Sequence, residues 1–108
     1  MSDCIREVYE TIVDRRGHPA DKSYTRYLFD QGVDKILKKV GEECSEVIIA
    51  AKNGKNEDTA GELCDLVYHA LVLMVQQGIT LEDIETILTE RHGKAGNLKQ
   101  FKKTDKNT

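Results

Sequence analysis

Apolar residues recur at spacings of three and four along most of the chain, which places them on one face of an α-helix. This pattern predicts helices over residues 4–13, 33–52, 57–77 and 81–91, with a short helix or turn over 24–30. No stretch of the sequence alternates in the way that predicts a pair of strands, and no segment repeats. We therefore expect an all-α fold, a helical bundle of four to five helices.

Glycine, proline and asparagine separate these segments where helices commonly end. Residues 17–19 (Gly-His-Pro) follow the first helix, and the turn residues 53–56 (Asn-Gly-Lys-Asn) separate the two longest helices. Gly78 follows the second of these, as a glycine often does just past a helix end. Thr80, with Asp83 three residues later, has the pattern of a capping box and predicts the start of the last helix.

Composition and charge narrow the class of protein. With 108 residues the chain is long enough for one core, which we place at residues 1–92, followed by a basic tail at 93–108. A net charge of −3 argues against a general nucleic-acid binder, and no apolar run approaches the roughly 18 residues of a membrane span. The charged N-terminus differs from a signal peptide, so we expect a cytoplasmic protein. Cys4, Cys44 and Cys64 lack metal-binding spacing and are expected to be reduced core residues.

Three acids of the first long helix lie close to its apolar face. Because successive residues turn by about 100°, Glu43 falls at the border of that face. Glu42 and Glu46 continue from this border toward the polar side, together with Lys35 and Lys39. Lysines and glutamates three or four residues apart also form solvated ladders of ion pairs on exposed helices. Both interpretations stay open for these residues.

The helix predicted over residues 57–77 carries one polar strip on an otherwise apolar surface. The strip consists of Glu62, Asp65 and His69, and nearly every other residue from Leu63 onward is apolar. A helix that is apolar on all sides is a buried one, so the strip must be buried or must line a cleft. One short chain has few other helices to cover such an apolar helix, so we expect a homodimer or a higher homo-oligomer. Taken alone, His69 is also explained as a hydrogen-bonded histidine of the core.

Carboxylates that converge in an apolar region need protons, cationic partners or a metal ion, because an unpaired buried charge is very unfavourable. Lys35 and Lys39 are too few to neutralise five acids. Mg²⁺ favours oxygen ligands, with Mn²⁺ as a substitute, so we expect the two long helices to build a Mg²⁺ pocket. Mg²⁺ held by a few carboxylates takes phosphate oxygens as further ligands, which suits hydrolysis of a phosphoanhydride with Lys35, Lys39 and Arg26 as cationic help. The GxxxxGK[ST] pattern of a P-loop is absent from the sequence.

Two acidic motifs carry a resemblance to a known family. The sequence EECSE (42–46) is followed after fifteen residues by ELCD (62–65), which resembles the EExxE…ExxD signature of the all-α, MazG-like nucleotide pyrophosphohydrolases. Within that superfamily, the chain resembles the phosphoribosyl-ATP pyrophosphohydrolase family. This closer likeness rests on four blocks: SYTRYLFDQG (23–32), KILKKVGEECSEVIIAAKN (35–53), ELCDLVYHALVLM (62–74) and ERHGKAGNLKQ (90–100).

The resemblance implies a dimeric helical bundle that binds Mg²⁺ and cleaves phosphoribosyl-ATP between its α and β phosphates. The products are phosphoribosyl-AMP and pyrophosphate, in the second step of histidine biosynthesis. The cyclohydrolase that is fused to some members is expected to be a separate chain here. Within the superfamily, the alternative is a house-cleaning nucleoside triphosphate pyrophosphatase, which acts on non-standard nucleotides.

Carried over by position, the resemblance also implies roles for individual residues. The metal ligands are Glu43, Glu46, Glu62 and Asp65, and Glu42 is a further ligand or the residue that orients water. The catalytic base is one of Glu42, Glu43 and Glu46. The substrate's phosphates or ribose are contacted by a set of residues in and before these motifs: Lys39, Lys35, Ser23, Tyr24 and Thr25, with His69 beside the metal ligands.

Two interpretations outside this superfamily also account for clustered acids. A helical interaction module would use the acids only to pair with lysines, and it would bind no Mg²⁺. A carboxylate-bridged di-iron bundle uses Glu-x-x-His pairs, a pattern that is absent because Asp65 stands three residues after Glu62. The tail GNLKQFKK (96–103) follows the family's usual ending only loosely, which leaves its part in substrate binding open.

Overall fold

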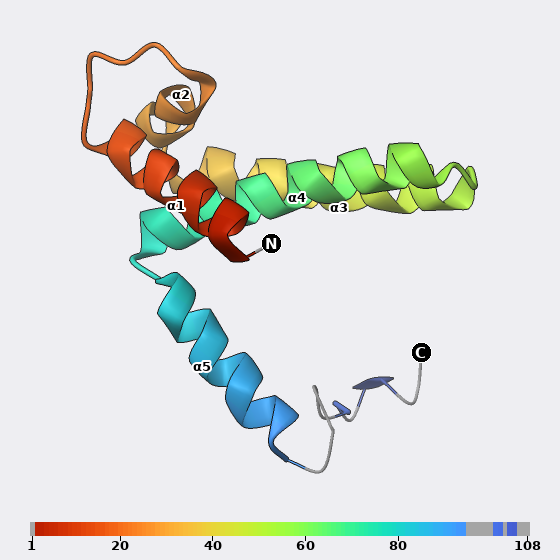
Figure 1. Ribbon diagram of the computed structural model, residues 1–108. Helices are drawn as coiled ribbons and strands as arrows, with labels where there is room; N and C mark the ends of the chain where they lie inside the picture. Colours follow the sequence, from red (N-terminus) through yellow and green to blue (C-terminus); the bar gives the residue numbers. More distant parts are fainter. Residues whose placement is uncertain (1, 95–100, 103, 106–108) are drawn as a thin grey trace. The chain divides into compact units, whose positions relative to one another are not determined.

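The fold consists of α-helices joined by short loops (Figure 1). A computed structural model of the chain describes residues 2–94, 101–102 and 104–105. None of these residues forms a strand, so the all-α prediction is confirmed. The helices are α1 (Ser2–Arg16), α2 (Tyr24–Gln31), α3 (Val33–Lys52), α4 (Asn56–Gln77) and α5 (Leu81–His92).

Packing divides the chain into two compact units, residues 1–78 and 79–108. Helices α1 to α4 belong to the first unit, and α5 belongs to the second. The predicted division into a domain at 1–92 and a basic tail at 93–108 stays a prediction, because most of that tail lies outside the described residues.

In the first unit, α3 and α4 form a long helical hairpin (Figure 1). The two helices lie side by side and are joined by a tight turn at residues 53–55. Gly54 in this turn has a φ of 79°, a value that favours glycine. α1 packs on α4, α2 packs on α3, and α1 and α2 contact each other. Figure 1 shows both of them at the end of the hairpin that lies opposite the turn.

The core of this unit lies where the four helices meet. The most deeply buried side chains come one from each helix: Ile12, Leu28, Ile36 and Val72. Two arginines cross the same junction and donate to backbone carbonyls. Arg16 Nη1 lies 2.8 Å from the oxygen of Val75, and Arg26 Nη1 lies 2.6 Å from the oxygen of Arg16. These bonds link α1 to α4 and α2 to α1 beside the apolar core.

Local sequence signals set the ends of the helices. Ser23 caps α2, because its hydroxyl accepts a hydrogen bond from the backbone N–H of Arg26 at 3.0 Å. Gly32, with a φ of 93°, separates α2 from α3. Gly78 adopts the left-handed conformation directly after α4, so the predicted end of that helix is confirmed.

The prediction that α4 is buried on all sides is wrong for the first half of the helix in a single chain. Buried residues begin at His69, whereas Leu63 and Val67 are each 44% exposed. On α3, Ile48 and Ile49 are also 63% and 55% exposed. The cause is the arrangement of the helices: α1 and α2 pack at one end of the hairpin and leave the other end uncovered.

Two further observations bear on the sequence predictions. Cys4, Cys44 and Cys64 are all exposed, so the prediction that they are core residues is wrong. Among the described residues, no single helix is long and apolar enough to cross a membrane, and only α4 and α5 taken together meet that length and composition.

The second unit is described by α5 and the few residues that follow it. The predicted capping box is confirmed: the Thr80 hydroxyl accepts from the N–H of Asp83 at 3.0 Å, and the Thr80 N–H donates to the Asp83 carboxylate at 2.8 Å. Near the end of the helix, Lys94 Nζ lies 3.5 Å from a carboxylate oxygen of Glu90.

Candidate active site

Three carboxylates from α3 and α4 meet on one side of the helical hairpin. One oxygen each from Glu43, Glu62 and Asp65 can be chosen so that all three lie within 4.8 Å of one another. We call these three residues the acidic cluster. The sequence predicted all three as metal ligands, and the structure brings them together.

The helical repeat explains why these positions converge. Glu62 and Asp65 are three residues apart on α4, so their side chains lie on the same face of that helix. Glu43 reaches them from the neighbouring helix α3, and its side chain is only 12% exposed. Asp65 is exposed to solvent, so a ligand can approach the cluster from outside.

Like charges surround Glu62. Partial burial raises the pKa of Glu62 above its ordinary value, and the negative charges of Glu46, Asp65 and Glu43 raise it further. Glu46, another predicted ligand, lies outside the group within 4.8 Å, yet its charge is the strongest of those that act on Glu62. The carboxylates of the site therefore repel one another, and this repulsion favours binding of a proton or a cation.

The donor set of the acidic cluster fits a hard divalent cation. Mg²⁺ binds oxygen at about 2.0–2.1 Å, so two ligands on opposite sides of the ion are roughly 4.2 Å apart. The oxygens of the cluster are within 4.8 Å of one another, so small rotations of the side chains bring them to such distances. A cation at this position would also relieve the repulsion that raises the pKa of Glu62.

Lys39 is the cation next to the cluster. Its Nζ lies 3.1 Å from Glu42 Oε2 and 3.7 Å from Glu43 Oε1. The hydrogen bond between Lys39 and Glu42 raises the pKa of the lysine and lowers the pKa of the glutamate. Glu42 therefore forms an ion pair with Lys39, as one of the two interpretations of the sequence predicted. Glu43 also lies near Lys39 and is at the same time a member of the acidic cluster. Lys35 lies further along α3, with its Nζ 6.0 Å from the centre of the Tyr27 ring.

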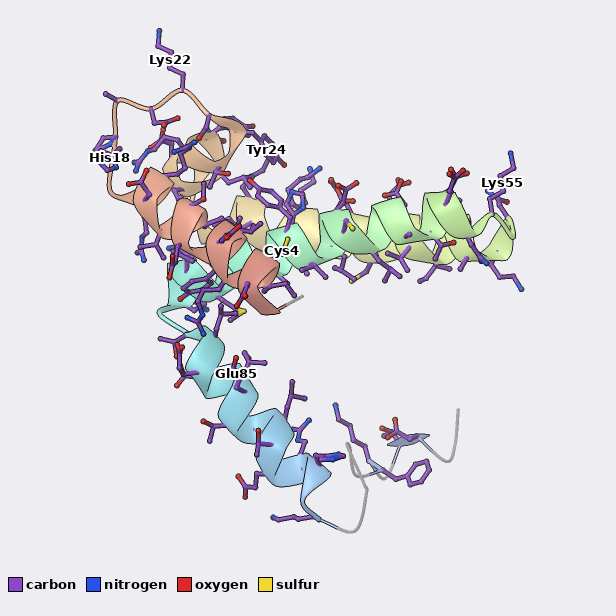
Figure 2. All side chains as sticks on the ribbon, viewed as in Figure 1. Cys4, His18, Lys22, Tyr24, Lys55 and Glu85 are labelled. Atoms are coloured by element: carbon purple, nitrogen blue, oxygen red, sulfur yellow. The ribbon has the colours of Figure 1, made fainter. Side chains whose placement is uncertain are left out.

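The first turn of α2 is joined to α4 by side-chain hydrogen bonds, and Figure 2 shows Tyr24 between α2 and the hairpin. The Tyr24 hydroxyl is 3.0 Å from Nε2 of His69. The other ring nitrogen, Nδ1 of His69, is 2.8 Å from the carbonyl oxygen of Asp65. Both nitrogens of this buried ring are therefore engaged, and His69 has the surroundings of a hydrogen-bonded core histidine.

The structure gives the remaining predicted residues the following places. Ser23 caps α2, and its backbone N–H donates to Asp21 at 2.6 Å, which lowers the pKa of that carboxyl. Thr25 forms a hydrogen bond through its hydroxyl with the hydroxyl of Tyr68. Tyr68 was not predicted as a site residue. The signal that could have found it is its place directly before His69 in the block ELCDLVYHALVLM (62–74).

Comparisons with known proteins agree on one family. The family model described as phosphoribosyl-ATP pyrophosphohydrolase matches residues 5–92. A phosphoribosyl-ATP pyrophosphatase of Clostridium novyi is 53% identical over 97 residues, which cover 90% of this chain and 88% of the relative. One from Bacillus cereus (strain AH187) is 47% identical over 105 residues, which cover 97% and 98%.

A histidine biosynthesis bifunctional protein HisIE of Lactococcus lactis is 54% identical over 100 residues. The match covers 93% of this chain and 47% of that relative, so the chain spans about half the length of the bifunctional protein. The acids of the cluster and the whole of α1 to α5 up to His92 lie within the matched family region, apart from the first residues of α1. The chain therefore belongs to the phosphoribosyl-ATP pyrophosphohydrolase family.

Proposed function

We propose that this chain hydrolyses phosphoribosyl-ATP to phosphoribosyl-AMP and pyrophosphate, the second step of histidine biosynthesis. The observation that carries the proposal is the acidic cluster of Glu43, Glu62 and Asp65 on the α3–α4 hairpin. The names of the Clostridium and Bacillus relatives supply the substrate. A helical interaction module would have no use for three converging carboxylates that repel one another.

Mg²⁺ is the cofactor that we propose for this site, with Mn²⁺ as a substitute. Glu43, Glu62 and Asp65 would hold the ion, and Glu46, whose charge acts on Glu62, is proposed as a further ligand. When bound, the ion supplies charge neutralisation for the phosphate groups of the substrate.

The chain's own residues divide the remaining tasks. Lys39 keeps its proton through its bond to Glu42 and adds positive charge beside the cluster, where a phosphate oxygen would lie. Glu42 stays ionised for the same reason, which lets it accept a hydrogen bond from the attacking water. Glu43 and Glu46 are the other candidates for this base. Ser23, Tyr24 and Thr25, at the start of α2, are proposed to contact the phosphates or the ribose.

Release of pyrophosphate tests the proposed reaction directly. Purified protein, incubated with phosphoribosyl-ATP and Mg²⁺, is expected to form one pyrophosphate for each phosphoribosyl-AMP. Release of orthophosphate alone would contradict the reaction. kcat/KM for phosphoribosyl-ATP is then compared with kcat/KM for a panel of nucleoside triphosphates. A higher value for one of the triphosphates would favour a house-cleaning pyrophosphatase.

Substitution of single acids tests the site. Asp65→Asn and Glu46→Gln are each expected to lower kcat/KM by more than about 100-fold, beyond what loss of a residue in the outer sphere of a metal costs. Both variants are expected to keep the fold, because each removes a charge from a repelling group. Glu57→Gln, at an exposed position in the first turn of α4, is the matched control. Near wild-type turnover of Asp65→Asn would remove it from the site.

We also propose that a second copy of the chain covers the exposed apolar surface of the hairpin. Exposed apolar residues of the hairpin include Ile48, Ile49, Leu63 and Val67, all more than 40% exposed. Val67→Lys is expected to halve the mass measured by light scattering. Val13→Lys, at a similarly exposed position on α1, is expected to leave the mass unchanged. Equal masses for wild type and Val67→Lys would mean that this surface is not the interface.

Two expectations about the surroundings of the chain stay predictions. A cytoplasmic location and a separate cyclohydrolase are both expected from the sequence. Fractionation of cells that carry the tagged protein tests the first. Assay of the purified protein for consumption of phosphoribosyl-AMP tests the second, and such consumption would contradict it.

A further inference from the structure

Two neighbouring residues of α4 hold two neighbouring residues of α2. The Tyr24 hydroxyl lies 3.0 Å from Nε2 of His69, and the hydroxyls of Thr25 and Tyr68 are hydrogen-bonded to each other. The rings also pack: the centroid of His69 lies 4.9 Å from that of Tyr68 and 5.8 Å from that of Tyr24, both edge to face. We call these four residues the α2 clasp.

His69 fixes the direction of one hydrogen bond in the clasp. Its Nδ1 lies 2.8 Å from the carbonyl oxygen of Asp65, which can only accept, so Nδ1 carries a proton. In the neutral ring Nε2 then has a lone pair, and the Tyr24 hydroxyl donates to it. The backbone of one residue of the acidic cluster is thereby linked, through His69, to the first turn of α2.

The clasp lies beside the acidic cluster. Partial burial raises the pKa of the Tyr24 hydroxyl, the charge of Lys39 lowers it, and the charge of Glu43 raises it again. The hydrogen bonds give the geometric link, because His69 bonds both to the Tyr24 hydroxyl and to the carbonyl oxygen of Asp65. The first turn of α2 is therefore connected through one side chain to a residue of the acidic cluster.

Tyr68 is a member of the clasp for which neither the sequence analysis nor the proposed reaction gives a task. Burial raises the pKa of its hydroxyl, and the group is hydrogen-bonded to the hydroxyl of Thr25. Its hydroxyl and Nε2 of His69 both bond to residues of α2, so both groups lie on the side of α4 that is turned toward α2.

The short helix α2 depends on such anchors. It has eight residues, fewer than the roughly 12–15 at which an isolated helix begins to persist in water. Leu28, which is completely buried, secures the middle of α2 in the core. The clasp acts on the first turn only. Loss of the Tyr68 hydroxyl would therefore loosen residues 24 and 25 and leave the core contact in place.

We propose that Tyr68 is a positioning residue of the active site, whose hydroxyl, through Thr25, holds the first turn of α2 at the distance from the acidic cluster that the substrate requires. The inference rests on the proposed function, because the place of this turn matters to turnover only if the turn contacts the substrate. Tyr68 itself touches no reacting atom in this proposal and acts through Thr25 and Tyr24.

Tyr68→Phe removes the hydroxyl and keeps the ring. We expect its KM for phosphoribosyl-ATP to rise about two- to tenfold, the effect of one lost hydrogen bond, with kcat within about twofold of wild type. Hydrogen exchange followed by mass spectrometry is expected to show faster exchange in the peptide that covers residues 23–31. Tyr27→Phe, on α2 itself, is the matched control, because no hydrogen bond of the Tyr27 hydroxyl occurs in the described part of the chain. Its KM and exchange are expected to equal those of wild type.

A double-mutant cycle tests whether the effect passes through Thr25. Thr25→Val removes the other partner of the same bond and also a hydroxyl proposed to contact the substrate, so Tyr68→Phe combined with Thr25→Val is expected to raise KM no further than Thr25→Val alone. Additive effects would overturn the proposal, and so would a normal KM or normal exchange in Tyr68→Phe.

Should wild type release no pyrophosphate from phosphoribosyl-ATP, the proposed function fails, whereas the exchange data still decide whether the clasp holds α2. If Tyr68→Phe does not fold, Thr25→Val alone is expected to show the same faster exchange in residues 23–31, and normal exchange would overturn the proposal.

Discussion

The two halves of α4, residues 56–67 and 68–77, both carry leucine and valine side chains but differ in what surrounds them. The second half, which we call the closed half, buries His69, Leu71, Val72 and Val75 at the end of the hairpin where α1 and α2 pack. The first half, which we call the open half, leaves Leu63 and Val67 almost half exposed. The acidic strip of Glu62 and Asp65 belongs to the open half, and the histidine that continues it belongs to the closed one.

This difference shows that the periodicity of a helix determines which residues share a face but not what covers that face. In the closed half the polar member of the strip finds hydrogen-bond partners and becomes part of the core. In the open half the carboxylates remain partly solvated and repel one another. An acidic site at the border between a packed region and an open one can be both held in place and reached by a ligand.

The largest expected effect separates the two halves by stability. Leu71→Ala is expected to lower the free energy of unfolding by about 2–5 kcal/mol, because Leu71 is only 5% exposed and leaves a cavity in the core. Leu63→Ala makes the same change in the open half and is expected to cost less than about half as much. Denaturant titration at protein concentrations low enough to keep the chain monomeric measures both. Equal losses would contradict the comparison and would place Leu63 in a packed core.

A smaller effect is expected from metal binding to the open half. Mg²⁺ at a concentration one hundred times its Kd is expected to add about 2.7 kcal/mol to the free energy of unfolding. Asp65→Asn is expected to lose most of this gain, because it removes one oxygen ligand of the acidic cluster, whereas Glu57→Gln keeps it. Thermal melts with Mg²⁺ and with a chelator provide the measurement. An equal gain in Asp65→Asn and in wild type would show that the ion binds elsewhere.

The parts of this fold that are determined locally could be predicted from the sequence. Gly78 ends α4, and Thr80 with Asp83 starts α5, because each signal acts within a few residues. Glu62 and Asp65 could be assigned to one face for the same reason, since a helix of known phase fixes their relative direction. Their meeting with Glu43 followed once two long helices were expected to face each other.

Contacts between distant segments could not be predicted in this way. Tyr68 occupies an ordinary apolar position of α4, and its partner Thr25 is 43 residues away, so no local periodicity relates them. The exposure of Leu63 and Val67 has a similar origin, because it depends on where α1 and α2 pack and not on α4 itself. The position of Glu46 on the face of α3 predicted its role only in part. Its charge acts on Glu62, but its oxygens lie outside the acidic cluster.

The smallest expected effect concerns the dependence of stability on pH in the open half. Because the pKa of Glu62 is raised in the folded chain, folding holds its proton more tightly, and its contribution to stability falls as pH rises from the ordinary value toward the raised one. In metal-free buffer, Glu62→Gln is therefore expected to have the Tm of wild type at low pH and a higher Tm at neutral pH. Glu42→Gln should behave in the opposite way, because its pKa is lowered by Lys39 and its stabilising contribution is present only above the ordinary value. Measured Tm values across pH 3 to 8 test both signs together, at about half-unit steps around the ordinary glutamate pKa of roughly 4.3. A lower Tm for Glu62→Gln at neutral pH would mean that a cationic partner already compensates the acidic cluster, and the case for a divalent ion there would lose its electrostatic basis.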